Sequence, residues 1–131
     1  MKYVATLIAC AVTALLMACG AGHPTIQSLQ VNPSQAQGSA PGGEVQFNAT
    51  GIFDNNQSRG LNATDGLTWS SSDSTVASID STTGQATCQT NGTVTITAKA
   101  PADLTFEVNN GVHNTSQTVT GTATLTCTLV P

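Results

Sequence analysis

Apolar and polar residues alternate along most of the chain, which is the pattern of β-strands with one buried face. In residues 44–53, Val45, Phe47 and Ala49 alternate with polar neighbours, as a half-buried strand requires. The longest alternation lies near the C-terminus. There one face carries Val119, Gly121, Ala123, Leu125, Cys127 and Leu129, and threonines occupy the positions between them. Both segments are therefore predicted to be strands, with Cys127 pointing into the core.

Further strands are predicted at residues 25–31, around Leu67 and Trp69, which share a face, and at residues 75–80. Glycine, proline and small polar residues dominate residues 34–43, which indicates either an edge strand or a loop. Residues 58–63 are expected to form a polar loop. Residues 85–90 and 93–99 are separated by Asn91-Gly92, the dipeptide that type I′ hairpin turns prefer. This spacing predicts that the two segments pair as a β-hairpin.

No segment places apolar residues three and four apart over the length that a helix needs. About seven short strands with frequent turns predict an all-β fold, a β-sandwich of Greek-key type. The 131 residues leave room for a single core.

The N-terminus has the features of an export signal. Lys2 precedes an apolar run that ends at Leu16-Met17-Ala18-Cys19, and this tetrapeptide resembles the lipobox at which bacterial lipoproteins are cleaved and lipidated on the cysteine. Residues 1–18 are thus predicted to be a lipoprotein signal peptide, residues 19–24 a tether lipidated at Cys19, and residues 25–131 the folded domain. The alternative is a transmembrane helix, but the run is shorter than the 18 or more apolar residues that spanning needs.

Export and cleavage limit the possible disulfide. Removal of Cys10 and acylation of Cys19 would leave only Cys88 and Cys127 as an intramolecular pair, in an oxidising compartment that favours a bridge. Two buried free thiols are the alternative.

The net charge of the mature chain limits the classes of partner that it can bind. After the loss of Lys2, two basic and seven acidic residues remain, and 2 minus 7 gives a net charge of −5. Nucleic acid is an unfavourable partner for such a surface, because phosphate binding needs clustered lysine and arginine. Gly20, and not an aspartate, follows Cys19; the resemblance to lipoproteins with enterobacteria-like sorting then implies anchoring in the outer membrane.

From Val31 to Leu125 the sequence resembles the group 2 bacterial Ig-like domain of invasin- and intimin-like adhesins. The similarity is carried by six strings in family order: residues 31–33 (VNP), 46–53 (QFNATGIF), 67–73 (LTWSSSD), 76–80 (VASID), 83–86 (TGQA) and 92–98 (GTVTITA). The resemblance implies a two-sheet Ig-like sandwich that serves as a spacer, adhesive or display module. The two cysteines and the long insert at residues 100–116 depart from the family pattern.

Few residues suggest a ligand site. Trp69 is predicted to be a core residue, with sugar stacking as the alternative. Phe53, Phe106 and His113 are candidate ligand contacts, the last two within the insert at residues 100–116. A carbohydrate-binding module is therefore the second functional hypothesis, behind a membrane-anchored structural or adhesive module with a protein or glycan partner at the cell envelope.

Metal binding, cofactors and catalysis are not expected. His23 and His113 lack neighbours at ligand spacing. The four carboxylates Asp54, Asp65, Asp73 and Asp80 lie beside turn residues, which suggests solvated turns and no calcium site. No nucleophile motif accompanies either histidine, so an enzyme is the least favoured class.

Overall fold

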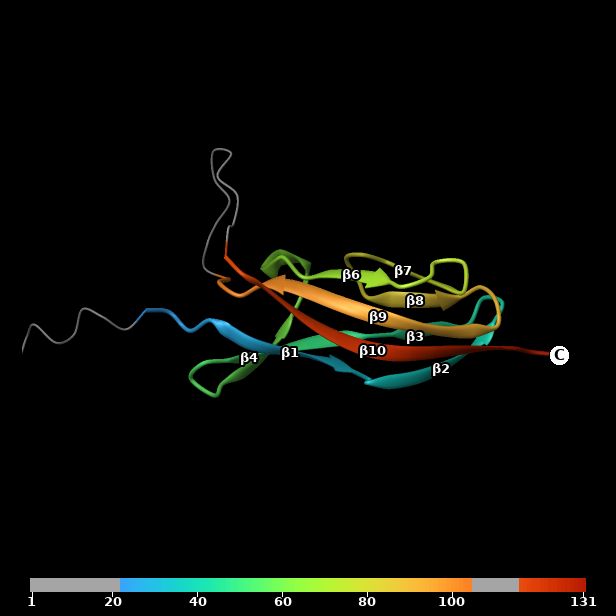
Figure 1. The fold of residues 1–131 in the computed structure, drawn as a ribbon, viewed down its shortest axis with the longest axis horizontal. Coiled ribbons are helices and arrows are strands. Elements are labelled where there is room, and N and C mark those ends of the chain that lie inside the picture. The colour runs from blue at the N-terminus through green and yellow to red at the C-terminus, as the bar shows by residue number, and fades with distance from the viewer. Residues whose placement is uncertain (1–21, 105–115) are drawn as a thin grey trace, which may run out of the picture.

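The computed structural model describes residues 22–104 and 116–131, which form a two-layered β-sandwich (Figure 1). Its strands in chain order are β1 (Ile26–Asn32), β2 (Gln35–Ala40), β3 (Glu44–Gln46), β4 (Asn48–Phe53), β5 (Ser58–Leu61), β6 (Thr68–Ser71), β7 (Ala77–Ile79), β8 (Gln85–Cys88), β9 (Gly92–Pro101) and β10 (Thr118–Leu129). A 3-10 turn, η2 (Ala63–Asp65), lies between β5 and β6. Within these residues there is no α-helix, and the predicted all-β fold is confirmed.

One layer is a four-stranded sheet with the order β2-β10-β9-β6. Strands β9 and β10 are antiparallel and pair from Thr118↔Pro101 to Cys127↔Gly92, which makes this ladder the longest in the described part. Strand β2 runs parallel to the second half of β10, from Thr124↔Gln35 to Leu129↔Ala40. Both central strands alternate threonine on the outer face with small or branched apolar residues on the inner face, as a sheet with one buried face requires.

The other layer contains two three-stranded groups, β1-β4-β5 and β3-β8-β7. They are connected because β3 and β4 are consecutive parts of the strand predicted at residues 44–53. The two parts are separated at Phe47, whose backbone N–H donates to the carbonyl of Gly84 at 3.0 Å.

This pairing is that of an Ig-like sandwich, in which strands A, B, E and D form one sheet and C, F and G the other. Strands β1, β3 with β4, β8 and β7 take the places of A, B, E and D, and β6, β9 and β10 those of C, F and G. About seven strands were predicted; the larger number observed arises from the break in strand B, the separate strand β2 and the additional strand β5.

The predicted hairpin at Asn91-Gly92 is wrong. Strand β8 pairs with β3 and β7, whereas β9 pairs with β10 and β6, so this turn connects the two layers. Asn91 also lacks the positive φ that a type I′ turn requires. Ala86 and Cys88 on β8 and Val94 and Ile96 on β9 are all buried, and the strands bury these side chains by facing each other across the core.

The loop predicted at residues 58–63 is also wrong for its first four residues. Residues Ser58–Leu61 form β5, which pairs antiparallel with β4. Its polar sequence reflects its position at an edge, where only Leu61 is buried. Of the two alternatives for residues 34–43, the edge strand is the one observed, as β2.

The core lies between the layers. It contains Phe47, Trp69, Ile96 and Leu125 together with the two buried cysteines, Cys88 and Cys127. Leu129, predicted to face inward, is instead 61% exposed. The pairing of β10 with β9 ends at Cys127, so Leu129 lies beyond the end of its neighbouring strand.

Within residues 22–104 and 116–131, no helix has the length and apolar content that would be needed to cross a bilayer.

Candidate functional site

Phe53, one of the candidate ligand contacts, lies at the end of β4 beside a surface depression of about 380 Å³. The depression is lined by Phe53, His23, Pro24, Gln57, Ser58, Arg59 and Leu104. Phe53 is only partly exposed and packs against the core. Phe106 and His113 lie outside the described residues, so the proposed grouping of the three stays a prediction.

A histidine and an aspartate that are 80 residues apart in the sequence meet near this depression. His23 Nε2 lies 3.0 Å from both carboxylate oxygens of Asp103. The contact joins the segment before β1 to the segment after β9. The depression therefore combines the Phe53 ring with polar side chains from two segments of the chain, the one before β1 and the one around the start of β5.

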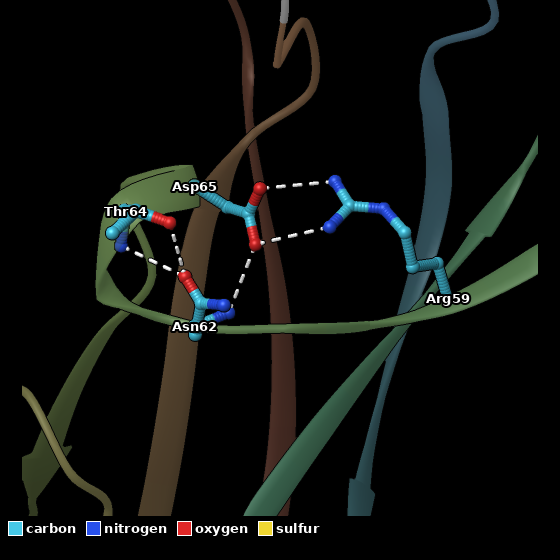
Figure 2. A network of polar contacts seen from close by, with 4 residues as sticks. All are labelled: Arg59, Asn62, Thr64 and Asp65. Carbon is cyan, nitrogen blue, oxygen red and sulfur yellow. Dashed lines mark hydrogen bonds and ion pairs between the residues drawn. The ribbon is translucent and has the colours of Figure 1, made fainter.

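The arginine at the rim is held in place by a polar network (Figure 2). Arg59 donates two hydrogen bonds to the carboxylate of Asp65, at 2.9 and 3.3 Å. Asp65 also accepts from the backbone N–H of Asn62 at 3.0 Å, while the Asn62 side chain accepts from the backbone N–H of Thr64 at 2.9 Å. This reciprocal arrangement is a capping box at the start of η2.

The network also sets the ionisation of Asp65. Partial burial acts to raise the pKa of its carboxyl group, but the hydrogen bonds from Arg59 and from the Asn62 backbone outweigh burial and lower the pKa. Asp65 is thus a charged structural partner that fixes the position of Arg59.

Asp73 and Asp80 lie in separate turns and hold those turns through hydrogen bonds. Asp73 accepts from the backbone N–H of Thr75 at 2.9 Å, and Asp80 accepts from those of Thr82 and Thr83 at 2.8 and 2.9 Å. The hydroxyl group of Thr82 and these two amides lower the pKa of Asp80 to about 2. Among the described residues, no three histidine, cysteine or acidic side chains gather as a metal site would require.

Trp69 is a core residue, as predicted. It is 5% exposed, and its ring centroid lies 6.5 Å from that of Phe47 with a tilt of 41°. A buried ring offers no platform for a sugar, so the described structure does not support the sugar-stacking alternative for Trp69.

The predicted bridge between Cys88 and Cys127 is present. It connects β8 in one layer to β10 in the other, with the two Cα atoms 5.6 Å apart. Both residues are fully buried, so the bridge is part of the core. Cys19, the predicted lipidation site, lies outside the described residues.

One surface feature was missed from the sequence: a groove of about 740 Å³ between β1 and the first half of β10. Its lining residues are Leu29, Gln30, Val31, Asn32, Ser34, Thr50, Thr120, Gly121 and Thr122. The length of the threonine alternation at residues 118–128 could have signalled it, because a strand of that length outreaches a short neighbour.

Comparison with known families supports the Ig-like character of the central segment. The family model described as "Intimin, immunoglobulin-like domain" matches residues 55–102, which run from just before β5 to just after β9. The match agrees with the resemblance to invasin- and intimin-type domains noted in the sequence. No curated protein matches the chain significantly.

Proposed function

We propose that this chain is a lipoprotein, anchored through Cys19, that displays an Ig-like module at the cell envelope for structural or adhesive contacts. The observation that carries the proposal is the Ig-like sandwich whose segment 55–102 matches the intimin Ig-like domain. A match of this type supports a surface module of the adhesion type, and such modules are not typically enzymes.

The arrangement of the sandwich suits this role. Strand β1 begins near one end of the long axis, and β10 ends at the other (Figure 1). A lipid on Cys19 would therefore leave the far end of the domain directed away from the membrane. Two or three acyl chains bind a membrane stably because each buried methylene contributes roughly 0.8 kcal/mol.

The anchor is tested with a matched pair of cysteine variants. Cys19→Ser should abolish lipid modification and release the protein from the membrane fraction, measured by intact-mass analysis and by fractionation. Cys10→Ser is the control, because Cys10 would leave with the signal peptide, and it should change neither result. A mature protein that keeps Met1, or a Cys19→Ser variant that stays in the membrane fraction, would contradict the proposal.

Carbohydrate binding is the second candidate, favoured by the position of Phe53 beside Arg59, Gln57 and His23 around the depression. Aromatic rings stack on sugars, and the polar side chains nearby can hydrogen-bond to hydroxyl groups. On a glycan array, Phe53→Tyr should keep any binding, and Phe53→Leu should lose it while retaining the apolar packing. An array without signal for the unmodified protein would remove this candidate.

A further inference from the structure

Within its own sheet, the first half of β10 is paired on one edge only. On one edge β10 is paired with β9 along most of its length, but on the other edge β2 covers only residues from Thr124 to Leu129. Residues 118–123 thus form the open part of an edge to which a strand is already joined further along.

Hydrogen bonds of neighbouring residues show where the backbone groups of this open part point. Thr124 donates its backbone N–H to the carbonyl of Ser34 at 2.9 Å, away from β9. Its cross-strand neighbour Thr95 donates its backbone N–H to the Ser72 hydroxyl group and accepts from the Ser72 backbone N–H, both at 3.0 Å. Both backbone groups of Thr95 thus point away from β10. Thr95 and Thr124 are therefore a non-hydrogen-bonded pair.

Because such pairs alternate along an antiparallel ladder, Thr122 and Thr120 also direct their backbone N–H and C=O groups away from β9. In the described part of the chain, neither residue has a backbone partner on that side. These groups are donors and acceptors that a neighbouring strand would normally satisfy.

Strand β1 passes beneath this edge without joining it. A Cβ atom on Gly121 would lie only 2.4 Å from the Leu29 carbonyl oxygen, so glycine permits the close approach of the two backbones. Nevertheless β1 is paired with β4 in the other layer. The groove of about 740 Å³ lies along this seam, with β1 and β10 as its walls.

The chemistry of the groove indicates what fits it. No charged side chain lines it, and residues 118–123 contain no lysine, acidic residue or proline, the usual protections of an exposed edge. In β2, the strand that already occupies the adjoining part of this edge, the alternate residues Ala36, Gly38 and Ala40 are small. A second strand on the same edge would need equally small residues above β1.

We propose that the open edge at residues 118–122 of β10 binds an extended, uncharged segment of a partner protein, which adds to the sheet as a further strand in line with β2. This mode of recognition draws affinity from main-chain hydrogen bonds and specificity from alternate side chains. The proposal rests on the proposed function as an interaction module and names the surface and the class of its partner.

The test uses the purified mature protein and an acetylated, amidated peptide with the sequence of β2, QAQGSA. Hydrogen exchange followed by mass spectrometry should show slower exchange in residues 118–123 at millimolar peptide, with residues 124–129 unchanged. A peptide of the same sequence that is N-methylated at alternate residues should give no protection, because its backbone donors are removed.

Two variants locate the interaction. Thr120→Pro removes the N–H directed into the groove and should weaken peptide binding about three- to tenfold, whereas Thr120→Val retains the N–H and should bind normally. Fluorescence of Trp69 verifies that both variants fold. Because the purified protein is used, the outcome does not depend on whether Cys19 anchors it in cells.

Three results would overturn the proposal. The first is the absence of protection with the unmethylated peptide at 5 mM, about the upper limit for weak recognition. The second is protection confined to residues 124–129, which would mean that the peptide replaces β2. The third is protection of residues 118–123 in the absence of peptide, together with dimers in sedimentation velocity. The last result would assign the edge to a second copy of this chain.

Discussion

Gly84 shows how closely single residues are fitted in this domain. It adopts a φ of +73°, and a Cβ atom there would lie 2.7 Å from the carbonyl oxygen of Phe47 and 2.8 Å from Cε2 of Trp69. Its own carbonyl accepts the Phe47 N–H at the break between β3 and β4. A side chain at this position would disturb both the break and the central tryptophan.

Gly84→Ala should therefore destabilise the fold by about 1–3 kcal/mol, because it combines a strained backbone with a steric clash. Urea denaturation monitored by Trp69 fluorescence measures the loss. Gly60→Ala is the matched control, since a Cβ on Gly60 meets nothing within 4 Å, and it should stay within about 0.5 kcal/mol. Equal effects of the two substitutions would contradict this account.

Asp80 makes stability depend on pH. Its pKa is lowered from 3.8 to about 2 by hydrogen bonds from Thr82 and Thr83, so the folded state favours the charged carboxylate. A group with a lowered pKa contributes stability above its unfolded pKa and loses it as the pH falls through the folded value. Asp80 should thus stabilise the domain fully above about pH 4 and progressively less toward pH 2.

Denaturation midpoints measured from pH 5 to pH 2 should accordingly fall less steeply for Asp80→Asn than for the unmodified protein. Asp54→Asn provides the comparison, because the Asp54 side chain accepts a single long hydrogen bond, 3.3 Å from the Thr25 hydroxyl group. An unchanged slope for Asp80→Asn would show that the turn contributes nothing to the pH dependence.

At the scale of strands, alternation of apolar and polar residues was a reliable guide and turn chemistry was not. The period of two in residues 118–129 correctly assigned Ala123, Leu125 and Cys127 to the core, because burial of one face acts directly on the sequence. By contrast, Asn91-Gly92 indicates a reversal of the chain but not which strands pair afterwards. Partner choice depends on which layer each strand joins, which residues distant in sequence decide.

The backbone conformation of Asn91 can be tested by comparison with a second asparagine, Asn56. Asn56 has a φ of +62°, while Asn91 lacks a positive φ. Asn56→Ala should cost about 1 kcal/mol for the left-handed conformation, and Asn91→Ala less than about 0.5 kcal/mol. Chemical denaturation of the two variants distinguishes the observed turn from a type I′ turn, because a type I′ turn at Asn91-Gly92 would make the two costs similar.

The candidate surfaces were less predictable than the strands. Phe53 was identified as an aromatic residue, but its contact with the core and its proximity to Arg59 depend on β5, whose polar edge sequence resembles a loop. The groove beside β10 depends on the chain crossing from one layer to the other between β1 and β2, and on the length of β2. The depression has no local sequence signature, and the only signal of the groove is the length of the threonine alternation at residues 118–128.

In the molecule as a whole, the Cys88–Cys127 bridge fastens the two layers together. It closes a segment with a sequence separation of 39 residues, for which the chain-entropy relation gives a stabilisation of about 4 kcal/mol. This is a large share of the free energy of unfolding of a typical domain, which is roughly 5–15 kcal/mol. The small domain is thus expected to depend on the bridge.

The variant with both Cys88→Ala and Cys127→Ala should lose about 4 kcal/mol in guanidinium denaturation. Reduction of the unmodified protein with dithiothreitol should produce a similar loss, while the double variant should not respond to reductant. A loss below about 1 kcal/mol would show that packing alone holds the two layers together.

The parallel pairing of β2 with β10 has a mechanical consequence. A pull between the start of β1 and the end of β10 would draw β2 and β10 in opposite directions along their shared ladder, from Thr124↔Gln35 to Leu129↔Ala40. The hydrogen bonds of that ladder lie across the direction of force and share the load, so they must break together and not one by one. A tethered protein built in this way would resist tension at the cell surface before its core opens.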